Sequence, residues 1–433
     1  MDPATIVVRG DSVLIRQFEV AAVDGPDRGA RVVSQSDELS IGTAEGNDLR
    51  LTDPAVSRHH CALRAGERGL HLVDLGSRNG TFLGDVGVFA CLVRSGGRVR
   101  VGKSTLTVRV LDGEIEQPIA VSDRLGPILG GSVAMRRLYP LIEQFGQSPA
   151  TVLVHGETGT GKELIAEAIH RASDRRDGPF VIVDCSALAH DLAESELFGH
   201  ERGSYTGAHT SRVGAFESAT GGTVFLDEIG ELSPVLQPLL LRVLEGRTIR
   251  RIGSNRQHPV DVRVIAASHR DLRSEVNEKR FRADLFYRLN VLRIAVPALR
   301  ERAGDVELLA RHFWRMFRPD SELPLSLLPA LAGRSWPGNV RELRNAIERS
   351  AHLTAGSDGS LVAPDPLSYQ KAKELATAAW ERAWIDQLLG ASGGNLSLAA
   401  RTARMGRSHL RMLARRHGLV TRTDGADLAE EPE

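Results

Sequence analysis

The hydrophobic pattern changes its period along the chain. In residues 1–112, short runs such as TIVV, LHLVDL and TLTVRVL alternate with turns rich in Gly, Asp and Asn. Short strands with frequent turn signals predict a small all-β sandwich. From Leu129, continuous apolar runs (TVLVHG, FVIVDC, TVFLDE, VRVIAAS) alternate with amphipathic segments. Strands that are apolar throughout are typical of a parallel sheet covered on both faces, so an α/β domain is expected there.

The C-terminal part has helical spacing that is interrupted by breaker residues. Helices are predicted on both sides of the SWPGN turn and again before Leu419. The expected order is an all-β sandwich (1–112), a linker (113–127), an α/β core (128–298), a helical subdomain (299–355), a second linker (356–371), an all-α segment (372–420) and a disordered tail (421–433).

Composition narrows the class of protein. The 433 residues carry 55 Lys and Arg against 55 Asp and Glu, so only local charge bears on nucleic-acid binding. The cysteines, Cys61, Cys91 and Cys185, have no metal-ligand spacing and fit a reducing compartment. No signal-peptide pattern is present, and no apolar run approaches the roughly 18 residues of a membrane span. A cytoplasmic protein is expected.

The segment GETGTGKE lies between a predicted strand and a predicted helix. Its G-x-x-x-x-G-K spacing lets backbone N–H groups and a helix N-terminus hold phosphates, with Lys162 reaching the β- and γ-phosphates. Glu163 stands where the general pattern has Ser or Thr for Mg²⁺. A tight glycine turn without function is the alternative, and the flanking strand and helix disfavour it. The expected ATP-binding residues are Gly156, Glu157, Thr158, Gly159, Thr160, Gly161, Lys162 and Glu163.

A pair of carboxylates ends the later strand TVFLDE. Ligands of α/β sheets bind at the carboxyl ends of strands. We therefore expect Asp227 to hold Mg²⁺ through water and Glu228 to polarise the water that attacks ATP. A solvated acidic turn is the alternative. Transition-state charge also needs cations, and Arg282, Arg288 and Arg341 are candidates, although a single helical arginine is more commonly solvated surface.

Residues 128–352 resemble the AAA+ domain of bacterial sigma-54-dependent transcriptional activators, the enhancer-binding proteins. The stretches that carry the resemblance are GETGTGKE, SELFGHERGSYTGA, GGTVFLDEIGEL, RFRADLFYRLNV, LRERAGDV and WPGNVREL. This family usually has Glu after the phosphate-binding lysine. The resemblance implies that Arg282 and Arg288 reach the ATP of a neighbouring subunit, that Arg341 is a sensor in the helical lid (299–355), and that the chain forms a ring, typically a hexamer.

The loop GSYTGA resembles the family's GAFTGA loop, which projects from the ring and grips the sigma factor. The resemblance implies that ATP turnover moves this loop and remodels the closed promoter complex. Two positions depart from the family, with Ser204 for Ala and Tyr205 for Phe, and both substitutions keep size or ring. An ordinary surface loop is the alternative. The expected contact residues are Gly203, Ser204, Tyr205, Thr206, Gly207 and Ala208.

Two further departures from the family lie close to the catalytic residues. Asp184 stands where the family commonly has an Asn that restrains the catalytic glutamate, and a carboxylate would repel it instead. His269 replaces the usual sensor Asn. Either residue is expected to alter how the nucleotide state reaches the loop.

The segment from Leu39 to Leu83 resembles a forkhead-associated (FHA) domain. Its marks are Gly42, Ser57-Arg58-x-His60 and Asn79-Gly80-Thr81. The resemblance implies that loops at one end of the sandwich bind phosphothreonine peptides, since convergent hydroxyl, amide and guanidinium groups hold a phosphate. Thr43 stands where the family typically has Arg, with Arg50 as a candidate substitute, and a role in protein contact alone is the alternative. The expected phosphopeptide-binding residues are Ser57, Arg58, Asn79 and Thr43.

Residues 393–419 carry six arginines and no acid, a local basic stripe suited to a phosphate backbone. Two helices joined by a short turn predict a helix-turn-helix, and the segment resembles the Fis-type domain of the same activators. Arg404 stands where that turn usually has Gly. The preceding helix is expected to form a dimer interface, and a solvated basic hairpin is the alternative. The expected DNA-binding residues are Arg407, Ser408, His409, Arg411, Arg415 and Arg416.

Together these features predict a sigma-54-dependent activator with a sensor, an ATP-driven motor and a DNA-binding domain. Its expected partners are upstream DNA, sigma-54 RNA polymerase, a phosphothreonine protein or Ser/Thr kinase, and copies of itself. One alternative is a DNA-binding adaptor or repressor whose ring does not remodel sigma-54. A weaker one is a remodelling ATPase for some other protein.

Overall fold

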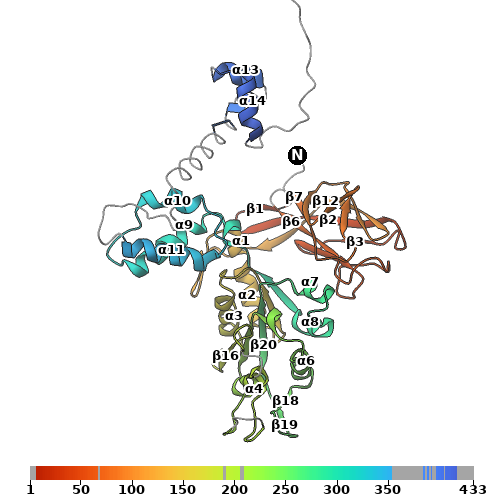
Figure 1. The fold of residues 1–433 in the computed structure, drawn as a ribbon, viewed down its shortest axis with the longest axis vertical. Helices are drawn as coiled ribbons and strands as arrows, with labels where there is room; N and C mark the ends of the chain where they lie inside the picture. Colours follow the sequence, from red (N-terminus) through yellow and green to blue (C-terminus); the bar gives the residue numbers. More distant parts are fainter. Residues whose placement is uncertain are drawn as a thin grey trace, which may run out of the picture. The chain divides into compact units, whose positions relative to one another are not determined.

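The computed structural model describes residues 6–66, 69–188, 192–204 and 209–353, and near the C-terminus residues 384–385, 388–389, 392, 396–403 and 405–416. The chain divides into two compact units, Met1–Gly359 and Ser360–Glu433. Figure 1 shows the first unit as a β-sandwich followed by an α/β core and a helical lid.

Two sheets form the N-terminal sandwich, which we define as residues 6–118. One sheet has the order β1-β2-β12-β11-β8-β9 with β3 on β2, and the other has the order β10-β7-β6-β4-β5. Alternate residues of each strand point inward, and Phe18, Leu39, Leu63 and Leu72 are fully or almost fully buried between the sheets. The strands are β1 Ile6–Arg9, β2 Ser12–Asp24, β3 Arg31–Val33, β4 Glu38–Gly42, β5 Leu49–Arg50, β6 Cys61–Gly66, β7 Gly69–Asp74, β8 Thr81–Leu83, β9 Val86–Val88, β10 Ala90–Val93, β11 Arg98–Val101 and β12 Ser104–Pro118.

The linker expected from residue 113 begins later than predicted. Strand β12 continues to Pro118 and stays paired with β2 after a register shift between Val110 and Glu114. The physical reason is a second small apolar cluster, in which Ile115 packs against Val13 and Ile15. Residues beyond it form a short hairpin of β13 (Arg124–Leu125) and β14 (Ile128–Leu129).

A five-stranded parallel sheet with the order β16-β17-β20-β15-β21 forms the centre of the α/β core. Neighbouring residues of one strand point to opposite faces of the sheet. Val152 therefore packs with α2 and α3, and Leu153 packs with the apolar cluster that includes α4, α6 and α8. Helices on both faces explain why these strands are apolar throughout. The strands are β15 Val152–His155, β16 Phe180–Asp184, β17 Thr223–Asp227, β20 Arg263–Ser268 and β21 Leu292–Ala295, with an antiparallel pair β18 Thr248–Arg250 and β19 Gln257–Pro259.

The helices of the core flank this sheet, with α2 and α3 on one side and α6, α7 and α8 on the other in Figure 1. They are α1 Val133–Arg136, α2 Leu138–Gly146, α3 Lys162–Arg171, α4 Ala193–Phe198, α5 Ala215–Ser218, η1 Ile229–Glu231, α6 Gln237–Gly246, α7 Leu272–Asn277 and α8 Ala283–Leu289.

A helical lid follows the core and has a hydrophobic core of its own. Trp336 is completely buried there, and its indole nitrogen donates to the carbonyl of Leu331. The lid elements are η2 Leu299–Glu301, α9 Asp305–Phe317, η3 Leu325–Leu327, α10 Leu328–Ala332 and α11 Asn339–Leu353.

In the second unit the structure describes two helices, α13 (Leu396–Thr402) and α14 (Arg407–Arg416). Ala399, Leu410 and Ala414 are buried between them, together with Ile385. The expected tail and Arg404 lie outside the described residues. Among the helices that are described, none is long and apolar enough to cross a membrane.

Candidate functional site

The glycine-rich segment forms the turn between β15 and α3. Gly159 and Gly161 have φ values of +80° and +99°, a left-handed backbone that glycine adopts without steric cost. Gly161 caps α3, whose first residue is Lys162. The free N–H groups at the start of α3 therefore open onto the turn, as a phosphate site requires.

Lys162 is buried, with 5% of its side chain exposed, and turns back into this loop. Its Nζ donates to the carbonyl of Gly156 at 3.1 Å and to Oε1 of Glu228 at 3.0 Å. The Lys162–Glu228 ion pair therefore joins the two segments that the sequence predicts to act on ATP. The charge of the lysine is held by a carboxylate at the place where a phosphate is expected.

Asp227 ends β17, and Glu228 follows with a left-handed backbone of φ 49°. Burial and the charge of Glu228 raise the pKa of Asp227, while Lys162 opposes the rise. Burial by itself would raise the pKa of Glu228 as well, but hydrogen bonds from His269 and Lys162 lower it. The two neighbouring carboxyl groups therefore differ in acidity.

His269 contacts the catalytic candidate directly. Its backbone N–H and its Nδ1 lie 3.0 and 2.6 Å from Oε2 of Glu228. Asp184 ends the adjacent strand in register with Asp227. Its Oδ1 accepts from the backbone N–H and the hydroxyl of Ser186, and these bonds lower the pKa of Asp184. The structure thus brings His269 to Glu228 and turns Asp184 toward Ser186.

Two lid residues that were not among the expected site residues contact the glycine-rich turn. Arg300 makes a two-armed ion pair with Glu157 at 2.6 and 2.9 Å. The amide of Asn339 donates to Glu157 and to the carbonyl of Thr158. The bonds from Arg300 and Asn339 lower the pKa of Glu157 to about 2. The sequence signal that could have identified Arg300 and Asn339 is their position in LRERAGDV and WPGNVREL, two of the stretches that carry the family resemblance.

Arg341 of α11 also lies beside the turn. Its Cβ is 3.1 Å from where a Cβ on Gly159 would stand. The backbone N–H of Val340 donates to the carbonyl of Gly159 at 3.0 Å, which fixes α11 against the loop.

Arg282 and Arg288 are on the other side of the core, at the start and in the last turn of α8. Both side chains are about half exposed, at 48% and 57%. Arg282 pairs with Asp284 and Arg288 with Glu245. Among the described residues, neither arginine contacts Lys162 or Glu228 of its own chain.

The GSYTGA loop is described only at its first residues. Gly203 has φ +78°, and the N–H of Ser204 donates to the carbonyl of Glu201. His200 forms β-bridges to Arg212 and Ile252, which fix the base of the loop. Tyr205, Thr206, Gly207 and Ala208 lie outside the described residues.

The candidate phosphopeptide residues lie in neighbouring loops of the sandwich. The N–H of Thr43 donates to the carbonyl of Ser57, and the hydroxyl of Ser57 accepts from the N–H of Arg78. Asn79 donates to the carbonyl of Ala55. The loop face, defined as residues 43–48, 52–60 and 75–80, therefore holds Thr43, Ser57, Arg58 and Asn79 together.

Two further groups of this face were considered from the sequence. His60 is buried, with Nδ1 facing the N–H of Ser57 and Nε2 facing the carbonyl of Gly80, so it holds the loops together. Arg50 turns to Glu45 and to the carbonyl of Thr43.

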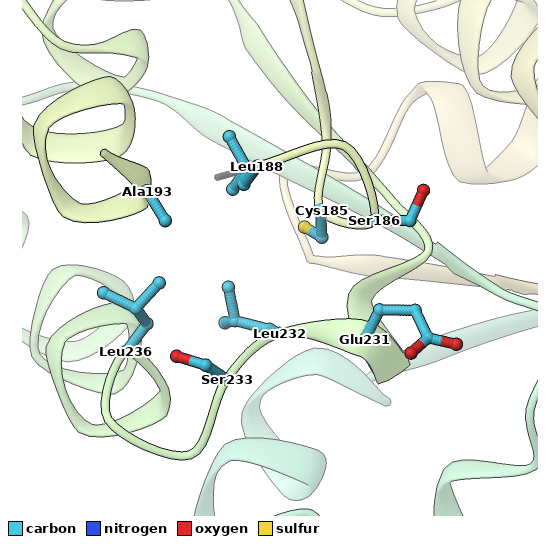
Figure 2. A pocket seen from close by; sticks show the side chains of 8 residues that line it. All are labelled: Cys185, Ser186, Leu188, Ala193, Glu231, Leu232, Ser233 and Leu236. Atoms are coloured by element: carbon cyan, nitrogen blue, oxygen red, sulfur yellow. The ribbon is translucent and has the colours of Figure 1, made fainter. Parts of the chain in front are cut away.

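A separate cavity of about 180 Å³ opens beside the end of β16. Figure 2 shows the Cys185 thiol turned into it, whereas the Ser186 hydroxyl and the Glu231 carboxylate point away. The remaining wall is made by Leu188, Ala193, Leu232, Ser233 and Leu236. Burial raises the pKa of the Cys185 thiol to about 12, and no residue of the glycine-rich turn lines the cavity. This hollow is distinct from the phosphate site.

In the second unit, the expected DNA-binding residues belong to α14. Arg407, Ser408, His409, Arg411, Arg415 and Arg416 all lie on this helix, and His409 is exposed.

The α/β core and the lid match two family models. Residues 128–295 match the sigma-54 interaction domain, and residues 300–379 match the AAA+ ATPase lid domain. Transcriptional regulatory protein ZraR of Escherichia coli K12 is 45% identical over 300 residues, which cover 66% of this chain and 68% of ZraR. The chain belongs to the sigma-54-dependent transcriptional activator family. The predicted AAA+ core and lid are thereby confirmed in this activator.

Other relatives agree with this assignment. DctD of Pseudomonas aeruginosa, the C4-dicarboxylate transport transcriptional regulatory protein, is 43% identical to this activator over 71% of its chain and 68% of DctD. Crystal structures of NtrX from Brucella abortus in complex with ADP and ATP have TM-scores of 0.54 and 0.51 at 32% and 34% identity. The ADP complex covers 67% of this chain and 70% of NtrX, and the ATP complex 69% and 71%.

The sandwich has a separate match. Residues 22–111 of the activator match a family model described as the cytoplasmic domain of an inner membrane component of T3SS. The FHA-type and Fis-type interpretations of the two ends stay predictions.

Proposed function

We propose that this activator forms a ring that hydrolyses ATP in order to open promoters held closed by sigma-54 RNA polymerase. The observation that carries the proposal is the Lys162–Glu228 ion pair, because it joins the phosphate-binding turn to the acidic end of β17 inside a sigma-54 interaction domain. ATP binding would break this pair, since the phosphates compete with Glu228 for the lysine.

Hydrolysis needs a positioned base and a cation site. Glu228, once released from Lys162, keeps its two contacts to His269 and would orient the attacking water. Asp227 at the end of β17 suits a hard cation, because a bound cation would offset the repulsion from Glu228 that contributes to the raised pKa of Asp227. Asp227 would hold Mg²⁺, which when bound neutralises charge on the β- and γ-phosphates.

The arginines of α8 support a site shared between subunits. Arg282 and Arg288 are exposed and lie apart from Lys162 of their own chain. An exposed guanidinium that pairs only with surface acids is free to exchange these partners for a neighbour's γ-phosphate. We infer that Arg282 and Arg288 act in trans, in a hexamer, while Arg341 senses the nucleotide from the lid.

The remaining parts couple hydrolysis to transcription. Tyr205 and Thr206, in the loop that begins at Gly203, would grip sigma-54. The arginines of α14, together with Ser408 and His409, would bind upstream DNA as the second helix of a helix-turn-helix. Ser57, Arg58 and Asn79 would bind a phosphothreonine protein.

Promoter opening tests this proposal. The full chain, sigma-54 holoenzyme, a supercoiled sigma-54 promoter and ATP are combined, and single-stranded DNA is detected by permanganate. We expect opening by the parent and by Ser211→Ala, the matched control at an exposed serine outside the contact loop, and none by Thr206→Ala. Hydrolysis by the parent without any opening would favour the alternative of a DNA-binding adaptor or repressor.

A further inference from the structure

The cavity beside the end of β16, which we call the Cys185 cavity, is bounded by three segments of the α/β core. Cys185 and Ser186 follow β16, Ala193 begins α4, and residues 231–236 join η1 to α6. Each of these segments adjoins a part of the proposed machinery. Strand β16 pairs with β17 and its terminal carboxylates, α4 precedes the GSYTGA loop, and η1 begins directly after Glu228.

The walls of the Cys185 cavity are mainly apolar. Leu188, Leu232 and Leu236 contribute aliphatic side chains, and Figure 2 shows the methyl group of Ala193 directed toward the space between them. Leu232, Leu236 and Ala193 are buried members of the hydrophobic cluster on this side of the sheet. Such walls offer water few polar partners, so they favour an apolar occupant.

Two donors interrupt the apolar wall. The Oγ atom of Ser233 is buried and has no hydrogen-bond partner in the part of the chain that the structure describes. The thiol of Cys185, a residue that is 5% exposed, is turned into the same space and is a weak donor. A buried hydroxyl without a partner is costly, and an acceptor oxygen inside the cavity would remove that cost. Apolar walls with a few polar groups are typical of a site for a small organic molecule.

The volume of the cavity limits the size of its occupant. The Cys185 cavity measures about 180 Å³. An engineered apolar cavity of about 150 Å³ in another protein binds benzene. The Cys185 cavity therefore has room for a single six-membered ring with a short substituent, and it is too small for a nucleotide or a peptide.

The surrounding charges favour a neutral occupant. Burial raises the pKa of the Cys185 thiol, and the charges of Asp184, Asp227 and Glu228 raise it further. The same negative potential opposes an anion in the cavity. The apolar walls disfavour a cation as well, because the carboxylate of the wall points away from the space (Figure 2). An alcohol or a neutral carbonyl compound meets these conditions and can accept from Ser233.

We propose that the Cys185 cavity binds a small neutral organic molecule, a single ring that carries one hydroxyl or carbonyl oxygen, and that the bound molecule slows ATP hydrolysis. The binding part of this inference stands on the cavity alone. The effect on hydrolysis rests on the proposed function, in which Glu228 leaves Lys162 when nucleotide binds.

The occupant would contact segments that are bonded to both catalytic carboxylates. The backbone N–H of Cys185 donates to the carbonyl of Asp227 at 2.9 Å, and the N–H of Glu231 donates to the carbonyl of Glu228 at 2.9 Å. A molecule packed between these segments opposes their relative movement. Because a ligand favours the conformation that has its binding site, the occupant stabilises the arrangement in which Glu228 is paired with Lys162.

Benzyl alcohol is the probe for binding, because it has one ring and one hydroxyl group. Its binding to the full chain without nucleotide is followed by saturation-transfer NMR, beside benzoate, which has the same ring and a negative charge. We expect saturable binding of benzyl alcohol with a Kd of about 1 mM or lower and no binding of benzoate. A signal that does not saturate below about 10 mM, or equal binding of benzoate, would overturn the proposal.

Two variants locate the bound probe. Ala193→Leu places a larger side chain in the cavity and should abolish binding, whereas Ala330→Leu, at an exposed alanine of α10, is the matched control. Ser233→Ala should weaken benzyl alcohol binding about five-fold, through the loss of one hydrogen bond, and leave the binding of toluene unchanged. Binding of ATP by each variant shows that it is folded. Parent-like affinity for benzyl alcohol in Ala193→Leu would place the probe elsewhere and contradict the assigned site.

Hydrolysis is measured with the same probe at saturation. We expect benzyl alcohol to lower the kcat of the parent and of Ala330→Leu by about five-fold or more, and to leave the kcat of Ala193→Leu at its own value without the probe. An unchanged kcat in a parent that binds the probe would overturn the effect on hydrolysis. If the parent hydrolyses no ATP without the probe, the proposed function fails, and the NMR results alone decide whether the cavity is a binding site.

Discussion

Lys162 and Glu228 form a 3.0 Å ion pair, so the cation expected to bind phosphate and the carboxylate expected to activate water hold each other. Each is nearly buried, and each has at least one further partner, the carbonyl of Gly156 for the lysine and His269 for the glutamate. Nucleotide binding must therefore exchange one buried ionic contact for another, which frees the glutamate only when phosphate is present.

The first prediction concerns Glu228 itself. Glu228→Gln keeps the shape of the side chain but removes the base, so the hydrolysis rate should fall by about 100-fold or more while ATP still binds. Lys162→Ala should weaken ATP binding instead. Steady-state hydrolysis and binding of a fluorescent ATP analogue separate the two effects. A Glu228→Gln protein with a rate near the parent's would show that another group activates water.

The second prediction compares the two departures from the family pattern. His269 holds Oε2 of Glu228, whereas Asp184 is turned to Ser186. His269→Ala should therefore lower the hydrolysis rate by about ten-fold, because a charge-assisted hydrogen bond is lost. Asp184→Asn should change it by less than about two-fold, a difference within the energy of one weak contact. The reverse order of effects, measured as kcat at saturating ATP, would contradict this reading of the geometry.

The third prediction addresses the site shared between subunits. Arg282→Ala and Arg288→Ala should each reduce hydrolysis by about 100-fold or more without loss of ATP binding. Mixing Arg282→Ala subunits with Lys162→Ala subunits should restore part of the activity, because some interfaces then combine an intact arginine with an intact lysine. Mixtures that stay as inactive as their components would argue for a site completed within one chain.

The fourth prediction concerns the pH dependence of stability. Burial is the main cause that lowers the pKa of His155 from 6.5 to about 4. The charges of Arg293 and Arg273 lower it further, whereas the charge of Asp271 raises it. Between these two pH values the unfolded chain binds a proton that the folded chain does not, so acidification favours unfolding. The proton uptake of His155 on unfolding should thus lower the free energy of unfolding by about 2 kcal/mol between pH 7 and pH 5. This contribution should level off below about pH 4.

The matched variant for this measurement is His155→Asn, which cannot bind the proton. Thermal unfolding at pH 7 and pH 5, at constant ionic strength, should show a smaller loss of Tm for the variant than for the parent. Equal losses would mean that the proton uptake on unfolding arises at other groups, among which His59, with a pKa of about 4 for the same reason, is the first to examine.

Features that depend on neighbours along the chain could be predicted from the amino-acid sequence. The glycine spacing of residues 156–162 dictates the left-handed turn before α3, and the run TVFLDE dictates a buried strand that ends in two carboxylates. The order of β-sandwich, α/β core and helical segment also followed from local periodicity, because strand and helix periods differ, whereas the AAA+ assignment came from the resemblance.

Which of these groups contact one another depends on the packing of whole elements and could not be predicted from the sequence. In the folded chain, Lys162 pairs with Glu228, which lies 66 positions further along the sequence. His269, and not Asp184, contacts the carboxylate of Glu228, and Asn339 contacts the phosphate-binding turn. Strand β12 also continues into the expected linker, and Asn277 contacts the loop face. Spacing in a sequence fixes backbone geometry over a few residues, whereas contacts between distant residues depend on how whole elements pack and on which buried charges then find partners.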